Sequence, residues 1–307
     1  MNKILIIIPE KLPQKLIMRG FCRGFKANKY YVETKFENEL SNEILENINP
    51  KMILSYGDFS ANSTFLTEFL KKNKKVKNLV YFADKKGANA KFSKNTYVFA
   101  SDRYINESFI YMPLAISSRT YGREFEKYEC SISFVANPNV VKKLKILSAV
   151  VKTFGHKLSI FCDKKDFDKS IKKMEKFLTS DELVTYKYCY SGFLKDEREI
   201  SKVLNASKIN LNIISQFDWS LNFHAFEVMA AGGFLLTNNA WAANEFFDLA
   251  RDLETYENED DLVDKIKFYL RQIDMAQNIA LNGKYIIAKA HTFKDRVKLI
   301  LKFLKSN

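Results

Sequence analysis

Short apolar runs alternate with amphipathic stretches along the whole chain. The first run, KILIIIP at residues 3–9, is continuously apolar, as in a strand buried on both faces. Similar runs follow at YYVETKF, KMILSYGD, NLVYFAD and TYVFASD, and intervening segments such as residues 64–75 carry apolar residues at helical spacing. Strands and helices that alternate at such short intervals predict a parallel sheet in a doubly wound α/β domain.

The same plan repeats after a polar, basic and aromatic stretch in the middle of the chain. SISFVAN, KLSIFCD and the short run TYKYCYSG predict strands, and residues 141–154 and 195–205 predict helices. We therefore expect two domains with a linker between them and a helical end. The predicted limits are residues 1–116, a linker at 117–129, residues 130–285, and a terminal helix at 286–307.

Residues 208–238 form the most informative stretch. The apolar strand INLNII leads into a helical pattern that Gly232 and Gly233 close as a C-cap would, and FLLT predicts the next strand. Glu227 lies among apolar residues of that helix, so it must be hydrogen-bonded or bound to a ligand, since burying it unpaired is costly. The ordinary alternative is that it pairs with His224, three residues earlier on the same face.

Composition and charge narrow the class of protein. An apolar fraction of 47% describes a packed globular chain, and the formal net charge of +13 favours an anionic partner such as a nucleotide, a nucleic acid or a membrane surface. Lysines that only solvate helix surfaces explain the charge equally well. The four cysteines are far apart, which suits free thiols in a reducing compartment, and we expect a cytoplasmic protein without a metal site.

Common cofactor and nucleophile motifs are missing. The chain has no G-x-G-x-x-G after a strand, no P-loop and no G-x-S-x-G, which disfavours a Rossmann dehydrogenase, a P-loop phosphotransferase and a serine hydrolase. Asp58, Asp84 and Asp102 each end a predicted strand, at the edge where such sheets bind ligands. Each is either a catalytic or acceptor-binding group or an ordinary helix cap or turn residue.

Two helix starts in the second domain suit a diphosphate. A helix amino terminus offers free N–H groups and a positive dipole end. Lys142 or Lys143 could reach a diphosphate from one such start, although a solvated lysine face is the ordinary explanation. Glu227, further along the other helix, could accept hydrogen bonds from the two hydroxyls of a ribose.

Several of these segments together resemble a known family. The runs YECSISFVAN, YSGFL, ASKINLNI, NFHAFEVMAAGGFLLTN, ETYENEDDLVDKIKFYL and AHTFKDR are similar in order and spacing to CgeB-type glycosyltransferases, from about Tyr128 to the C-terminus. His224 stands where that family often has Arg, which replaces a permanent cation by a titratable one. Ala136 stands where it usually has Gly, and Trp219 occupies the place of the first Glu of retaining enzymes, so no anomeric outcome is assigned.

The resemblance implies an architecture and an activity. It implies two Rossmann-like doubly wound domains facing a cleft (the GT-B fold), with an N-terminal acceptor domain, a C-terminal donor domain and a final helix that returns to the N-terminal domain. The implied reaction moves a sugar from a nucleoside-diphosphate-sugar to an acceptor hydroxyl in bacterial surface glycan synthesis, without metal or cofactor. The implied partners are a glycan or lipid-linked glycan acceptor and, peripherally, the anionic inner face of a membrane.

The resemblance also implies a donor site. Glu227 matches the glutamate that binds the donor ribose, and His224 would share the diphosphate with Lys142 or Lys143. Asp84 and His224 are the catalytic candidates. The remaining expected donor contacts are Asn137, Phe193, Asn222, Phe226, Gly232, Gly233, Thr237 and Asn238.

Two other classes of protein share this pattern. One is a non-catalytic nucleotide- or nucleic-acid-binding protein of the same fold, although no nucleic-acid motif is present and nucleic acid is not the expected partner. The other is a GT-B-fold sugar-nucleotide epimerase, which would act on the donor without a glycan acceptor.

Overall fold

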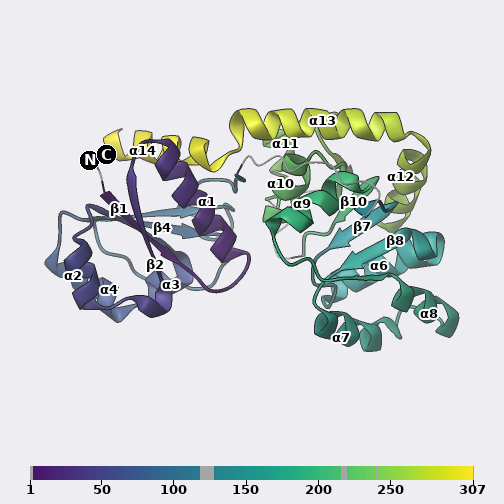
Figure 1. Ribbon diagram of the computed structural model, residues 1–307, viewed down its shortest axis with the longest axis horizontal. Coiled ribbons are helices and arrows are strands. Elements are labelled where there is room, and N and C mark those ends of the chain that lie inside the picture. Colours follow the sequence, from purple (N-terminus) through teal and green to yellow (C-terminus); the bar gives the residue numbers. More distant parts are fainter. Residues whose placement is uncertain (1–2, 118–127, 216–219, 239–240, 307) are drawn as a thin grey trace. The chain divides into compact units, whose positions relative to one another are not determined.

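The computed structural model describes residues 3–117, 128–215, 220–238 and 241–306 (Figure 1). The chain divides into two compact units: unit 1 is Met1–Ser117 with Ala290–Asn307, and unit 2 is Ser118–Lys289. Most of the linker predicted at residues 117–129 lies outside the described residues, as does Trp219.

Unit 1 is built on a parallel sheet in the order β2-β1-β3-β4-β5-β6. Its strands are β1 (Lys3–Ile8), β2 (Tyr31–Phe36), β3 (Met52–Tyr56), β4 (Lys77–Phe82), β5 (Thr96–Ala100) and β6 (Ile110–Tyr111). Its helices are α1 (Gln14–Ala27), α2 (Asn42–Ile48), α3 (Gly57–Asn62), α4 (Thr64–Lys72) and α14 (Phe293–Ser306). The predicted doubly wound domain is confirmed.

The two faces of this sheet are covered by different helices. Leu5 and Ile7 of β1 point to the face that α2 and α4 cover, in a cluster that includes Phe69. On the other face the ring of Phe21 in α1 packs edge-on against Tyr81 of β4 at 4.9 Å and against Phe293 of α14 at 5.0 Å between centroids. This is the alternation that a strand buried on both faces requires.

The C-terminal helix completes unit 1, as predicted. A Cβ atom at Gly20 of α1 would lie 2.1 Å from the Phe293 ring, and one at Gly24 would lie 2.5 Å from the Phe293 carbonyl oxygen. Helices α1 and α14 therefore approach closely only because both positions are glycine (Figure 1). Arg296 of α14, 4% exposed, donates to the carbonyls of Pro113, Leu114 and Ala290. These bonds tie α14 to the segment that leaves the sheet.

Unit 2 repeats the plan with a parallel sheet in the order β12-β11-β10-β7-β8-β9. Its strands are β7 (Ile132–Val135), β8 (Leu158–Phe161), β9 (Tyr190–Gly192), β10 (Ile209–Asn212), β11 (Leu235–Asn238) and β12 (Glu254–Tyr256). Its helices are α6 (Val141–Phe154), α7 (Lys164–Met174), α8 (Ser180–Tyr188), α9 (Glu197–Ala206), α10 (Phe223–Ala231), α11 (Ala243–Phe246), α12 (Glu259–Arg271) and α13 (Ile273–Ala290).

One predicted strand is wrong. TYKYCYSG was expected to be extended, but its first half is the end of α8 and only β9 is a strand. The reason lies upstream, where Thr179 and Glu182 form a capping box that starts a helix and carries it through Tyr188. The strand β12 was not predicted at all, because its three residues are too short to show a period.

Strand β10 shows how a partly polar strand is buried on both faces. Ile209 and Leu211 point into the apolar core of unit 2. On the opposite face, Asn210 is 1% exposed; it accepts a hydrogen bond from the Ser133 hydroxyl at 2.8 Å and donates to the Leu204 carbonyl of α9 at 2.9 Å. These hydrogen bonds offset the cost of removing the amide from water.

No helix among the described residues is both long enough and apolar enough to cross a bilayer.

Candidate functional site

The strand order of unit 2 reverses between β10 and β7. The chain moves outward from β7 through β8 to β9, then returns to β10 and moves outward the other way to β11 and β12. Open α/β sheets bind ligands outside the carboxyl ends of their strands at such a reversal. Since α6 follows β7 and α10 follows β10, the amino ends of both helices lie at this point.

Helix α10 offers ligands only a narrow face. Most of its side chains are buried, and within the helix only His224, Glu227 and Ala230, spaced by three residues, are partly accessible. His224 Nδ1 lies 3.3 Å from Glu227 Oε2, and the two side chains are 14% and 16% exposed. The sequence left open whether these residues pair with each other, and in this structure they do. Both remain accessible on the one open face of the helix.

The start of α10 is fixed by a network of amides. Asn222 is the N-cap, and its Oδ1 accepts the Ala225 N–H at 3.0 Å. Its carboxamide also exchanges two hydrogen bonds with that of Asn212 at the end of β10, and Asn212 donates as well to the Thr237 hydroxyl at 3.0 Å. Asn222 and Thr237, both expected to contact a donor, thus have their polar atoms engaged in holding α10 to the sheet.

Asn238 and Phe226, which were also expected to contact the donor, likewise have partners within unit 2. Asn238 Oδ1 accepts from the backbone N–H of Ile214 at 2.6 Å, which fixes the chain just after β10. Phe226 is 2% exposed and packs edge-on against Phe247. These two residues and Thr237 are buried, so they support the site from behind.

Positions 232 and 233, which follow α10, are both glycine, but for different physical reasons. Gly232 has φ +78° and ends the helix as a left-handed C-cap, which confirms the predicted stop. At Gly233 a Cβ atom would lie 2.3 Å from the Leu204 carbonyl oxygen and 2.5 Å from Asn210 Nδ2. Glycine there allows β11 to approach α9 and β10.

The start of α6 is the second part of the site. The helix has no side-chain cap, and its first turn contains Lys142 and Lys143. Lys143 Nζ donates to the carbonyl of Asn137 at 3.1 Å and lies 5.8 Å from the Phe134 ring centroid. Burial lowers the pKa of Lys143. In the described part of the chain it pairs with no carboxylate, so an anion would relieve the cost of burying its charge.

Phe193 stands apart from this group. It follows β9 at the edge of the sheet and its ring is 59% exposed. The structure therefore brings together the amino ends of α6 and α10 by topology, while Phe193 lies at the end of the outermost strand.

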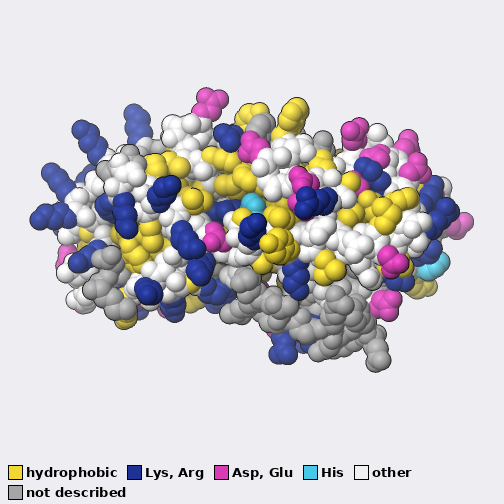
Figure 2. All heavy atoms as spheres, turned by 90° about the horizontal axis from the view of Figure 1, so that it is seen from above, with side chains coloured by type: hydrophobic (Ala, Val, Ile, Leu, Met, Phe, Trp, Pro, Cys, Tyr) yellow, Lys and Arg dark blue, Asp and Glu magenta, His cyan; other side chains and the backbone are white. Residues whose placement is uncertain are grey.

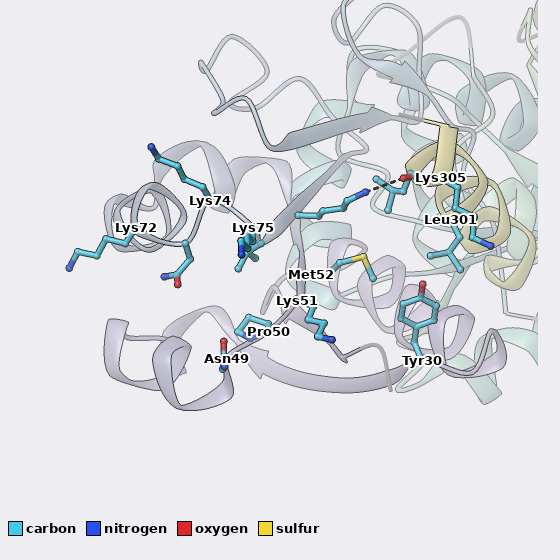
Figure 3. A pocket seen from close by; sticks show the side chains of 14 residues that line it. Tyr30, Asn49, Pro50, Lys51, Met52, Lys72, Lys74, Lys75, Leu301 and Lys305 are labelled. Atoms are coloured by element: carbon cyan, nitrogen blue, oxygen red, sulfur yellow. Dashed lines mark hydrogen bonds between the residues drawn. The ribbon is translucent and has the colours of Figure 1, made fainter.

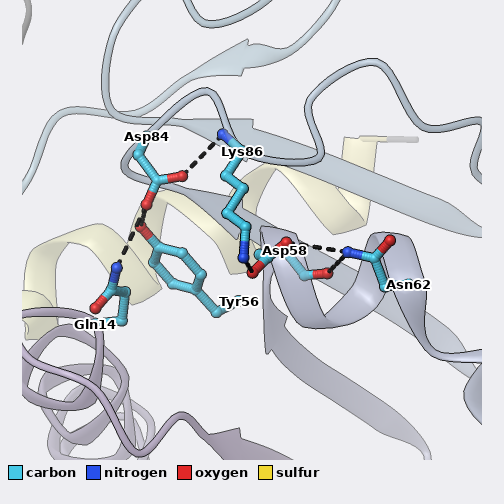
Figure 4. Close-up of polar contacts among 6 residues, drawn as sticks. All are labelled: Gln14, Tyr56, Asp58, Asn62, Asp84 and Lys86. Carbon is cyan, nitrogen blue, oxygen red and sulfur yellow. Dashed lines mark hydrogen bonds and ion pairs between the residues drawn. The ribbon is translucent and has the colours of Figure 1, made fainter.

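Unit 1 collects acidic groups at the carboxyl edge of its own sheet. Asp84, just after β4, accepts a 2.6 Å hydrogen bond from the Tyr56 hydroxyl and a 2.9 Å bond from the Lys86 N–H, with Gln14 beside it (Figure 4). Asp58, in the first turn of α3, pairs with the Lys86 ammonium group and accepts from Asn62 (Figure 4). Figure 4 shows both carboxylates within reach of Lys86.

Two pKa shifts mark this edge. Burial, followed by the nearby Asp84 carboxylate, raises the pKa of Tyr56 far above its usual range, so the phenol stays protonated and donates. Burial and the charge of Asp58 raise the pKa of Glu37, which follows β2 at the same edge. Asp102 has a different role, because it is fully buried and caps a turn by accepting the Tyr104 N–H at 2.8 Å.

Some of these groups were not visible in the sequence. Tyr56 joins Asp84 only through the register of β3 and β4, and Asn212 pairs with Asn222 although the two are ten residues apart in the chain. Asparagines at alternate positions of an apolar strand were the available signal for the second case. Within the described ranges, no three His, Cys, Asp or Glu side chains come together in a way that could hold a metal ion.

Solved structures share this fold over its full length. A glycosyltransferase from Rickettsia africae aligns with a TM-score of 0.72 at 13% identity over 99% of this chain and 98% of its own. A sucrose-phosphate synthase from Thermosynechococcus elongatus aligns with a TM-score of 0.71 at 9% identity, over 100% and 99%. Anabaena HepE, solved with UDP and glucose, gives 0.66 at 10% identity, over 100% of each chain. Two parallel-sheet Rossmann-like units of this kind define the GT-B fold of glycosyltransferases.

The family follows from the sequence comparison. The family described as glycosyl transferase-like matches residues 143–302, which is more than half of the chain, and this protein belongs to that family. No curated protein sequence matches this chain.

Proposed function

We propose that this protein transfers a sugar from a nucleoside-diphosphate-sugar to an acceptor hydroxyl, as a CgeB-type member of its family. The observation that carries the proposal is the narrow accessible face of α10, which presents His224 and Glu227 beside the point where the strand order reverses. A carboxylate kept partly accessible on an otherwise buried helix is suited to bind a ligand.

Each half of the donor has a matching group in unit 2. Glu227 accepts hydrogen bonds from the ribose hydroxyls, exchanging its contact with His224 for them. The diphosphate lies at the start of α6, which has no side-chain cap and where Lys142, Lys143 and the positive end of the helix dipole attract an anion, with His224 beside it. Asn137 positions Lys143 through its carbonyl. A uridine nucleotide is the donor we favour, because HepE was solved with UDP and with UDP-glucose.

Most of the other predicted donor residues support the site without contacting the donor in this proposal. Asn222, Thr237 and Asn238 hold α10 and the end of β10 in place. Phe226, Gly232 and Gly233 pack that helix against its neighbours. Phe193, an exposed ring at the sheet edge, is available to the base or sugar.

The reaction needs a base on the acceptor side and a stabilised leaving group. In unit 1, Asp84 takes the proton of the acceptor hydroxyl while the hydroxyl oxygen forms the new bond to the anomeric carbon. The bond from that carbon to the diphosphate breaks, and the charge that develops there is met by Lys142, Lys143, His224 and the start of α6. These groups replace a metal ion, so transfer should persist in excess chelator; restoration of lost activity by added Mg²⁺ would refute this.

The acceptor we propose is a glycan or lipid-linked glycan of the bacterial surface, glycosylated at the cytoplasmic side of the membrane. The net charge of +13 supports peripheral contact with an anionic bilayer.

A thermal-shift screen against UDP-, GDP-, dTDP- and CMP-sugars tests the function. A ligand at 100 times its Kd adds about 2.7 kcal/mol to the free energy of unfolding, which should raise the melting temperature by roughly 5 °C or more. We expect UDP-sugars to give the largest shift, and UDP release to require an acceptor. Silence towards all four classes together with oligonucleotide binding would favour a nucleic-acid-binding protein, and conversion of the donor without acceptor would favour an epimerase.

A further inference from the structure

A cavity lies in unit 1, at the opposite edge of the sheet from Asp84. It has a volume of about 870 Å³ and opens at the amino ends of β3 and β4, where the last turns of α14 meet the loop after α4. Figure 3 shows Lys72 and Lys74 on one side of this hollow and Lys305 on the other, with Met52 between them. Its size is that of a small-molecule site, yet none of the groups proposed for sugar transfer lines it.

Lysines form its rim. Six of them line the cavity: Lys51, Lys72, Lys74, Lys75, Lys77 and Lys305. Lys77 donates to the Leu304 carbonyl at 3.0 Å. The other five are exposed, and none of their ammonium groups forms an ion pair with any described residue. Figure 2 shows many Lys and Arg side chains on the surface of unit 1. So much unpaired positive charge around one hollow favours an anionic occupant.

The floor of the cavity is apolar. Met52, Val76 and Leu304 are buried below the rim, and Leu301 is half-buried beside them. A free inorganic anion or a nucleic acid backbone would leave this floor without a partner. An amphiphile with an anionic head and a hydrocarbon body satisfies both the rim and the floor.

We propose that this cavity binds the headgroup of an anionic phospholipid and so docks unit 1 on an anionic bilayer through the amino edge of its sheet. The phosphate sits among the rim lysines, and the glycerol and first acyl carbons lie on Met52, Val76 and Leu301. This locates the peripheral membrane contact proposed above, on which it builds, but it is independent of sugar transfer, since the carboxyl edges of both sheets stay uninvolved.

The test is flotation with vesicles of phosphatidylglycerol and phosphatidylcholine, compared with phosphatidylcholine alone. The rim variant is K72E/K74E/K75E, and the matched control is K172E/K173E/K176E, where three exposed lysines lie in and just after the last turn of α7. Both lower the formal net charge by six, from +13 to +7. At about 1 kcal/mol per lysine near the surface, the rim variant should bind anionic vesicles roughly 100-fold more weakly, and the control should stay near wild type.

A second pair of variants tests the floor. L301D places a carboxylate in the cavity, whereas L299D places one on an exposed site of the same helix outside it. We expect L301D to reduce vesicle binding at least tenfold more than L299D, and excess inorganic phosphate to compete only weakly. Melting curves and UDP titrations of all variants should match wild type, which separates loss of lipid binding from loss of fold or of the donor site.

Three results would overturn the proposal. An equal loss of vesicle binding in the rim variant and its control would show a general effect of net charge. Full competition by inorganic phosphate, with L301D behaving as L299D, would show a simple anion site. Binding of duplex DNA as tight as that of anionic vesicles, abolished by the same rim changes, would show a polyanion surface instead.

Discussion

The carboxamides of Asn212 and Asn222 hydrogen-bond each other in both directions, at 3.1 and 3.0 Å. Asn212 is the last residue of β10 and 2% exposed, and Asn222 is the N-cap of α10. This reciprocal pair links the end of a strand at the reversal of the sheet to the helix that carries His224 and Glu227. The position of the proposed donor groups therefore depends on the hydrogen bonds between these two amides.

Replacing Asn222 by Ala should destabilise the protein by about 2 kcal/mol, because it removes a helix cap and leaves Asn212 without its partner. Asn222→Ser retains the capping oxygen and should lose less. Chemical unfolding of both variants, with UDP affinity measured alongside, checks this. Equal stability of wild type and Asn222→Ala would mean that the amide pair does not hold α10.

Gly20→Ala should destabilise unit 1, although Ala is a better helix former than Gly by about 1 kcal/mol. The added Cβ would lie 2.1 Å from the Phe293 ring, so α1 and α14 must separate. Melting curves of Gly20→Ala, Phe293→Leu and the double variant form the test. The smaller side chain should recover part of the loss; a Gly20→Ala variant more stable than wild type would contradict this packing.

His291 should make the protein acid-sensitive. Burial and the neighbouring Arg296, whose Nη2 donates to His291 Nδ1 at 2.9 Å, lower the pKa of His291 from 6.5 to about 4. Between these pH values the unfolded chain binds a proton that the folded chain excludes, so stability present above pH 6.5 is lost as the pH falls towards 4. The full loss is about 3 kcal/mol.

The measurement is the free energy of unfolding across this pH range for wild type and for His291→Asn, whose Oδ1 can accept from Arg296 without titrating. The Asn variant should show a shallower decline. His156→Gln, at an exposed site, serves as the control and should follow wild type. Identical slopes for wild type and His291→Asn would exclude His291 as the source.

Asp84→Asn should lower the rate of sugar transfer by roughly 100-fold or more, as expected for loss of a general base. The affinity for UDP should not change, because the proposed donor groups all belong to unit 2. Tyr56→Phe, which removes the 2.6 Å hydrogen bond to Asp84, should have a smaller effect. If Asp84→Asn were fully active and Asp58→Asn were inactive, the general base would be Asp58 and not Asp84.

Much of the architecture could be predicted from residue patterns. Continuous apolar runs such as residues 4–8 marked the buried parallel strands, and Gly232 marked the end of α10. One failure came where local signals competed. The aromatic, β-prone run before β9 suggested a strand, but the capping box at Thr179 started a helix that ran into it.

The site was less predictable, for a physical reason. Pairing of His224 with Glu227 depends only on helical spacing and could be foreseen. The burial of Thr237 and Asn238 depends on the register between β10 and β11. The lysine-rimmed cavity is assembled from segments near residues 50, 75 and 305, which no local pattern relates.

The most direct test of the account is calorimetric titration of UDP into wild type, Glu227→Gln and a control, Glu175→Gln, in which an exposed glutamate at the end of α7 is changed. Hydrogen bonds to a charged group contribute about 1.5–3 kcal/mol, so Glu227→Gln should weaken UDP binding by roughly 10- to 100-fold. The control should bind as wild type does. Unchanged affinity in a folded Glu227→Gln variant would contradict the donor site proposed on α10.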